Sequence, residues 1–227
     1  MLDYLLSAIE PHVKSLTSYV RWPEHELIIM FSSFHTNSFV ALLFPKAVGF
    51  NHSYYQPLCL AILKGDWKST RDFLDIDPSA LTAKVAVLGR TALHVAAVGA
   101  QWEFVIKLVQ EMPEDMLTEL DLMGRSCLHY VAMGRSINAA KALVTKNPCV
   151  TQVTDFKGFT PLIYSITSKR CKEMVWYLVS NTTDERPSCP FSGPSASQLV
   201  ALLTAAGYHG FKLRSASAIA AAVLLMR

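Results

Sequence analysis

Cysteine pairs of the kind that hold a zinc ion or a disulfide framework are absent from this sequence. The 227 residues include five cysteines, which are widely spaced and never form a CxxC pair. Structural zinc sites need closely spaced cysteines, and a disulfide framework needs an even number of them, so the pattern argues against both kinds of site. We therefore expect no metal site and a reducing compartment, with Cys189, in an exposed loop, as the one thiol worth testing for reactivity.

Short catalytic and nucleotide-binding motifs are absent as well. The strings G-x-S-x-G, G-x-x-x-x-G-K-[ST], H-E-x-x-H and the EF-hand loop do not occur in the chain. His94 and His129 invite a catalytic or metal-binding interpretation, because histidine is the common acid–base group and metal ligand. No carboxylate or cysteine recurs beside both, however. We expect no catalytic residue and no cofactor, and hence a function other than catalysis.

Charged residues are few, and no block of one sign stands out. They make up 17% of the sequence, with a net charge of +3. Since a nucleic-acid-binding domain would carry a basic patch or stripe, we expect no nucleic-acid partner. The one local cluster, Lys169, Arg170 and Lys172, fits a solvated turn, with contact to an acidic partner or an anionic lipid as the alternative. A hydrophobic fraction of 51% indicates a chain that folds over most of its length.

One uncharged stretch, residues 27–44, approaches the length of a membrane-spanning helix. Its centre is polar, from Ser32 to Ser38, and unpaired polar groups are costly inside a bilayer. A buried strand and turn, or a loosely folded arm, is the preferred interpretation, and a membrane span is the alternative. At the start of the chain, Asp3 and Glu10 interrupt any apolar run, so we expect no signal peptide.

The middle of the sequence repeats one unit. GRTALHVAAVG, from Gly89, returns 35 residues later as GRSCLHYVAMG, from Gly124. Four corresponding anchors occur at spacings of 35, 35 and 34 residues: Gln56, Thr91, Ser126 and Thr160. An apolar pair follows each anchor by 17 or 18 residues, and a proline follows each pair, at Pro78, Pro113, Pro148 and Pro187. Because proline ends a helix, each unit is predicted to hold two helices that stack on the neighbouring units.

Turn sequences join the units. DLMGRS, from Asp121, and DFKGFT, from Asp155, share the form D-x-x-G-x-[ST], in which Asp and Gly supply turn chemistry and the hydroxyl caps the next helix. The preceding turn, KVAVLGRT, has Ala86 in place of the aspartate, so we expect it to be held less firmly. In the helices that follow these turns, Leu93 and Leu128 are predicted to lie on the buried face.

The units resemble ankyrin repeats, whose period is near 33 residues and whose first helix opens with T-P-L-H-x-A-A. The corresponding stretches here are TALHVAA, SCLHYVA and TPLIYSI. The resemblance implies an all-α solenoid of four clear repeats plus a degenerate fifth, in which His94 and His129 tie neighbouring turns together through backbone hydrogen bonds. The predicted division is an N-terminal region at 1–53, poorly defined or capping, an ankyrin domain at 54–213 and a tail at 214–227. The units are placed at 54–88, 89–123, 124–157, 158–192 and 193–213.

The long connection RPSCPFSGPSASQLVALLTAAGY, from Arg186, is similar to that of plant ankyrin proteins with a membrane-embedded PGG domain, which are linked to defence and stress signalling. This resemblance implies a plant signalling role and association with a membrane. The sequence stops at Arg227, where those proteins continue into membrane helices, so we expect the PGG region to be missing. The expected location is the cytoplasm or the cytoplasmic face of the plasma membrane.

Function is then expected on a surface that binds a protein partner. Stacked repeats present an extended concave face, and the variable residues at turn tips and exposed first-helix positions decide what binds there. Tyrosine and arginine suit such interfaces, although the two tyrosines of this set have packing against the next repeat as the alternative. The tryptophans at 67, 102 and 176 are predicted to pack between repeats. The predicted binding residues are Leu88, Arg90, Val95, Met123, Arg125, Tyr130, Lys157, Phe159 and Tyr164.

Overall fold

The structure is a computed structural model, and it describes residues 52–134, 136–168, 171–185, 188–193 and 195–206. Internal contacts divide the chain into Met1–Phe50 and Asn51–Arg227, and every described residue belongs to the second unit. Several predictions concern residues outside the described ranges. These are the N-terminal region up to residue 51, including the stretch 27–44, the basic pair Lys169 and Arg170, Pro187, the end of the fifth unit from residue 207 and the tail 214–227.

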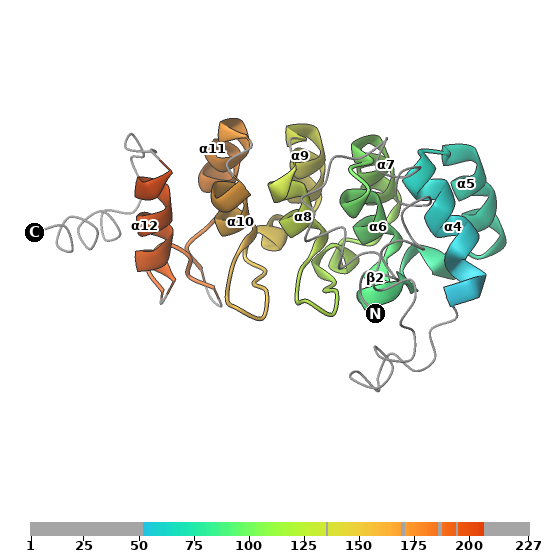
Figure 1. Ribbon diagram of the computed structural model, residues 1–227, viewed down its shortest axis with the longest axis horizontal. Helices are drawn as coiled ribbons and strands as arrows, with labels where there is room; N and C mark the ends of the chain where they lie inside the picture. Colours follow the sequence, from blue (N-terminus) through green and yellow to red (C-terminus); the bar gives the residue numbers. More distant parts are fainter. Residues whose placement is uncertain (1–51, 135, 169–170, 186–187, 194, 207–227) are drawn as a thin grey trace, which may run out of the picture. The chain divides into compact units, whose positions relative to one another are not determined.

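Helices occur in consecutive pairs (Figure 1). The first two pairs are α4 (His52–Lys64) with α5 (Trp67–Ile76), and α6 (Ala92–Val98) with α7 (Trp102–Glu111). The next two are α8 (Cys127–Met133) with α9 (Ile137–Lys146), and α10 (Pro161–Ser168) with α11 (Lys172–Asn181), followed by α12 (Ala196–Ala205). The described part of the chain is mostly helical, and the predicted helical pairs are present. None of its helices is long and apolar enough to cross a membrane.

Each pair packs on the pairs before and after it in the sequence. The first helices form one row, in which α6 contacts α4 and α8, and α10 contacts α8 and α12. The second helices form another row, in which α9 contacts α7 and α11. Figure 1 shows the pairs side by side in chain order, with the loops that join α7 to α8 and α9 to α10 projecting to the same side. The stacking therefore brings successive turns, which are distant in sequence, next to one another.

Leucines at equivalent positions form the core of the helix pairs. Leu93 and Leu128 in the first helices, and Leu108 and Leu143 in the second helices, are fully buried. Ala96 is buried beside them, and its small side chain lets neighbouring helices approach closely. All residues of α6 are buried, because α4, α7 and α8 each pack against it. The buried face predicted for the first helices is confirmed.

Prolines mark the ends of the second helices. Pro78, Pro113 and Pro148 each come two residues after such a helix ends. Short 3-10 turns follow, at Pro78–Leu81, Asp115–Thr118 and Pro148–Thr151. Proline has no amide hydrogen and a fixed φ, so it cannot continue an α-helix but suits the first position of a new turn. The predicted role of proline is confirmed at these three positions.

The turn without an aspartate is closed by backbone pairing. Strands β1 (Lys84–Ala86) and β2 (Arg90–Thr91) are antiparallel, with Lys84 opposite Thr91 and Ala86 opposite Arg90. Between them Leu88 takes a φ of 64°, which costs free energy for a residue with a Cβ. The Leu88 carbonyl accepts a 2.7 Å hydrogen bond from the Leu122 backbone N–H in the next turn. Whether this turn is held less firmly than the others stays a prediction.

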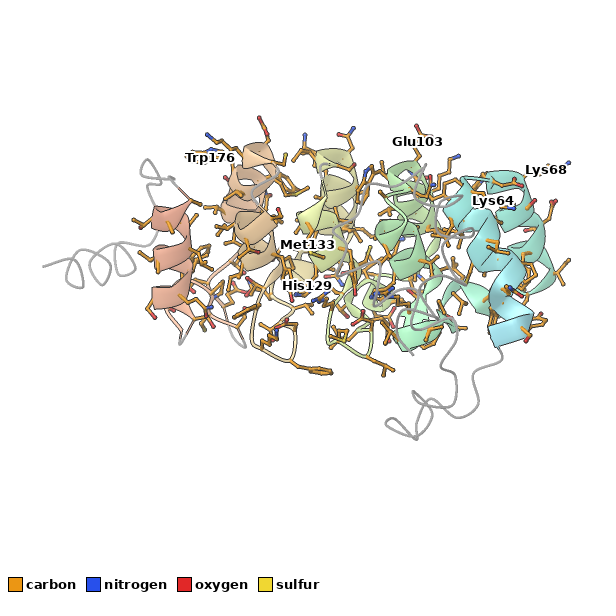
Figure 2. All side chains as sticks on the ribbon, viewed as in Figure 1. Lys64, Lys68, Glu103, His129, Met133 and Trp176 are labelled. Atoms are coloured by element: carbon orange, nitrogen blue, oxygen red, sulfur yellow. The ribbon has the colours of Figure 1, made fainter. Side chains whose placement is uncertain are left out.

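Of the three tryptophans predicted to pack between repeats, Trp67 and Trp102 do so. The ring of Trp67 meets that of Phe104 edge-on, with centroids 5.2 Å apart. Trp102 lies against Gly134, where an added Cβ would come within 2.5 Å of the indole ring. Trp176 differs, because it is half-exposed on α11, on the side of the helices away from the hairpin turns (Figure 2).

Candidate functional site

Two hairpin turns between the helix pairs are built in the same way. The Asp121 carboxylate accepts hydrogen bonds through Oδ1 from the backbone N–H groups of Met123 (2.8 Å) and Arg125 (3.0 Å). Asp155 accepts the equivalent bonds from Lys157 and Phe159, both at 2.8 Å. The predicted D-x-x-G turn is confirmed in both copies, and the aspartate side chain organises each one.

A tyrosine from the following helix completes each turn. The Tyr130 hydroxyl donates to Asp121 Oδ2 at 2.5 Å, and the Tyr164 hydroxyl donates to Asp155 Oδ2 at 2.7 Å. Burial raises the pKa of both tyrosines to about 12, so each hydroxyl stays protonated and remains a donor at neutral pH. Both oxygens of each aspartate are therefore engaged within the protein.

The histidines link one turn to the next, as the resemblance implied. His94 Nδ1 lies 2.8 Å from the Thr91 hydroxyl oxygen and also accepts the Thr91 backbone N–H. The ring proton is therefore on Nε2, which donates to the Arg125 carbonyl at 3.1 Å. His129 repeats this arrangement, with Nε2 donating to the Phe159 carbonyl at 3.0 Å, and lies close to the hairpin turns (Figure 2). Burial lowers the pKa of both histidines to about 4.

Arginine and tyrosine side chains alternate along the base of the turns. We call this set, Arg90, Tyr130, Arg125 and Tyr164, the arginine–tyrosine stack. The guanidinium of Arg90 lies 5.3 Å from the centre of the Tyr130 ring, and that of Arg125 lies 5.7 Å from Tyr130 and 5.1 Å from Tyr164. Cation–π contacts of this length are attractive, so the stack joins three successive turns.

Two of the predicted binding residues are not on an open surface. Val95 is 5% exposed and Tyr130 is 3% exposed. Val95 belongs to α6, which is enclosed by neighbouring helices. Tyr130 is covered by the two arginines of the stack, and its hydroxyl is bonded to Asp121. The expected exposure of these two residues is wrong, and the alternative of packing between repeats holds for Tyr130.

The remaining predicted binding residues differ in exposure. Met123 is 42% exposed, and Lys157 is also exposed. The others are only partly accessible at the base of the turns: Leu88, Arg90, Arg125, Phe159 and Tyr164. Their side chains support the turns, and what they present to solvent is limited. Whether they contact a partner stays a prediction.

Phe156 is an exposed turn residue that the sequence interpretation did not select. It is 76% exposed at the tip of the second of these turns, next to Lys157. Its counterpart in the preceding turn is Leu122, so an apolar residue directly after the turn aspartate recurs in both copies. That recurrence in a solvent-facing turn was the available signal. We call Met123, Phe156 and Lys157 the tip surface.

The described cysteines differ in accessibility: Cys149 is exposed, Cys127 is buried, and Cys59, Cys171 and Cys189 are intermediate. The Cys59 thiol donates to the Val85 carbonyl, and burial raises its pKa to about 12. Burial also raises the pKa of Cys127, so both thiols stay protonated and inert. No group of three or more His, Cys, Asp or Glu side chains in the described ranges could hold a metal ion. The reactivity of Cys189, which is half-buried, stays a prediction.

The comparison with known families agrees with this architecture. The family model for ankyrin repeats matches residues 101–187, as three copies. No curated protein matches the chain. The matched range covers both aspartate turns, His129 and the whole of the helices from α7 to α11. Residues 101–187 of this chain therefore carry ankyrin repeats.

Proposed function

We propose that this chain is a non-enzymatic adaptor that binds a protein partner through its hairpin turns. Ankyrin repeats are protein–protein interaction modules, and their presence in residues 101–187 is the observation that carries the proposal. We further propose that the repeats form an all-α solenoid of four units and a degenerate fifth, within a domain at 54–213. Stacked units of this kind expose variable turn residues on a scaffold whose own core is closed.

The tip surface is the part of the described unit best suited to contact a partner. Met123 and Phe156 expose apolar area, and Lys157 adds a charge beside it. The first helices offer less accessible surface to a partner, because positions such as Val95 and Tyr130 are buried. The rigid network of Asp121, Asp155 and the arginine–tyrosine stack holds the turns in place, which reduces the entropy lost on binding.

Site-specific photo-crosslinking tests this proposal. The intact chain is expressed in cells with Phe156→p-benzoylphenylalanine and irradiated, and the adducts are identified by mass spectrometry. The matched control carries the same group at Ile76, which is 82% exposed at the end of α5 in the first helix pair. We expect one recurrent protein adduct from position 156 and none from position 76. Absence of any adduct at 156, or the same adducts from both positions, would sink the proposal.

A second candidate is a partial form of a membrane-anchored ankyrin signalling protein acting at the plasma membrane in plant stress or defence. Its support is the uncharged stretch 27–44 and the resemblance of the connection after Arg186 to plant PGG-domain proteins. Carbonate extraction separates it from a cytoplasmic adaptor. Pelleting of the intact chain after carbonate treatment favours the membrane form, and recovery in the supernatant without detergent contradicts it.

A further inference from the structure

The aspartates of the two turns are not available to a partner, and this sets the charge of the tip surface. Asp121 and Asp155 are buried, and each carboxylate already accepts two backbone N–H groups and a tyrosine hydroxyl. Glu119, just before the first of these turns, pairs with Lys84 at 2.6 Å. Lys157 is exposed and forms no ion pair with any described carboxylate. The charge that the tips present outward is therefore positive.

The apolar part of the tip surface is built by contact between neighbouring turns. Gly124, at a φ of +75°, lets the next turn approach so closely that an added Cβ would lie 2.7 Å from the Phe156 backbone nitrogen. The same Cβ would lie 2.9 Å from Cδ1 of the Phe156 ring, so the ring rests against the Gly124 backbone. Phe156 is nevertheless 76% exposed, and Met123, adjacent to Gly124 in sequence, is 42% exposed. An aromatic side chain and a flexible methionine thus lie on touching turns and remain uncovered.

From this placement we infer that the tip surface binds an acidic peptide segment of a partner protein that also carries an aromatic or aliphatic side chain. In this complex, the apolar side chain of the peptide packs on the open face of Phe156 beside Met123, and carboxylates of the peptide pair with Lys157. Aromatic residues carry much of the binding free energy at interfaces, and methionine adapts to the shape of its partner. A complementary charge adds specificity and association rate. This inference rests on the proposed function and assigns the chemistry of its partner.

Selection from a random peptide display library tests the inference. The intact chain is the bait, and the double variant Ile76→Ser, Lys141→Glu, altered at exposed positions on α5 and α9, is the matched control. We expect both baits to enrich peptides with net negative charge and at least one aromatic or large aliphatic residue. Enrichment of neutral or basic peptides, or no enrichment, overturns the inference.

The affinity of the most enriched peptide is then measured by fluorescence anisotropy. Phe156→Ser should weaken binding by about tenfold or more, as removal of an interface anchor does. Lys157→Glu should weaken it by about tenfold, with a steep dependence on salt, while Lys157→Arg should stay within about twofold. Unchanged affinity in Phe156→Ser or Lys157→Glu overturns the inference. Both residues are exposed, so circular dichroism is expected to show unaltered folding.

Two further outcomes distinguish this inference from the alternative explanations. If the intact chain sediments with phosphatidylserine vesicles and Lys157→Glu does not, while no acidic peptide is enriched, the tip surface binds lipid and the inference is overturned. If the crosslinking at Phe156 yields a protein adduct but selection yields no acidic peptide, the proposed function stands and the partner chemistry is wrong. Failure of both experiments removes both proposals.

Discussion

His94 and His129 show how single buried residues connect the turns of this protein. Each imidazole accepts through Nδ1 near its own turn and donates through Nε2 to a carbonyl of the next turn. The neutral ring performs both roles, whereas a protonated ring could no longer accept. Because burial lowers the pKa of both to about 4, the neutral form persists well below physiological pH.

The two histidines should make stability depend on pH between about 6.5 and 4. In that window the unfolded state takes up protons that the folded state excludes, so the free energy of unfolding falls as pH falls. At pH 5 the loss should be roughly 2 kcal/mol per histidine relative to pH 7.5. Urea unfolding at pH 7.5 and at pH 5 measures this loss of stability. In the His129→Gln variant, the difference in the free energy of unfolding between pH 7.5 and pH 5 should be about half as large. Equal free energies of unfolding at the two pH values in the unaltered chain would contradict the prediction.

At the scale of elements, the hairpin turns depend on glycine for two distinct reasons. Gly124 and Gly158 both adopt positive φ, +75° and +77°, in a region that favours glycine. Of these two glycines, Gly124 is the one against which described residues of the next turn press closely. At Gly158 the nearest described atom to an added Cβ is the Ser195 hydroxyl oxygen, 4.0 Å away, so no described residue presses against this glycine.

Alanine substitution at the two glycines should separate conformational strain from close contact. Both Gly124→Ala and Gly158→Ala incur the cost of positive φ, about 1 kcal/mol. Gly124→Ala must also displace the Phe156 backbone, so we expect it to cost at least about 1 kcal/mol more than Gly158→Ala. Thermal and urea unfolding of the two variants measure the difference. Equal destabilisation would mean that the contact between the turns is not maintained in solution.

At the scale of the whole described unit, stability depends on contact between successive helix pairs. The first helix α8 contacts α6 on one side and α10 on the other, and α9 completes its own pair. Leu128 of α8 is fully buried at the centre of these contacts. In an array of this kind, each helix pair covers the apolar surface of its neighbours, because an isolated pair cannot bury its own apolar face.

Shortening Leu128 to alanine should therefore weaken more than one pair. We expect Leu128→Ala to lower the free energy of unfolding by about 2 to 5 kcal/mol, because it leaves a cavity in the core. Hydrogen exchange should increase in α6 and α10 together with α8. The exposed counterpart, Ile76→Ala, should change stability by less than about 0.5 kcal/mol. Faster exchange confined to α8 and α9 would show that the pairs do not stabilise one another.

The repeat period, the helical pairs, three proline-marked helix ends and the aspartate turns followed from the sequence, and the histidine links followed from the resemblance to ankyrin repeats. Those features depend on residues close together in the chain or on a motif with a known geometry, so the local pattern is sufficient. The sequence also placed Leu93 and Leu128 on the buried face, but tertiary packing decided the exposure of Val95, Tyr130 and Phe156. Val95 is buried because neighbouring helices enclose α6. Tyr130 is buried because Arg90, from the preceding unit, and Arg125, from the turn before its own helix, cover its ring. Phe156 is exposed because its ring rests on Gly124, in the preceding turn, and nothing described covers its other face. The exposure of these three residues depends on neighbours that are distant in the sequence, so their local pattern could not predict it.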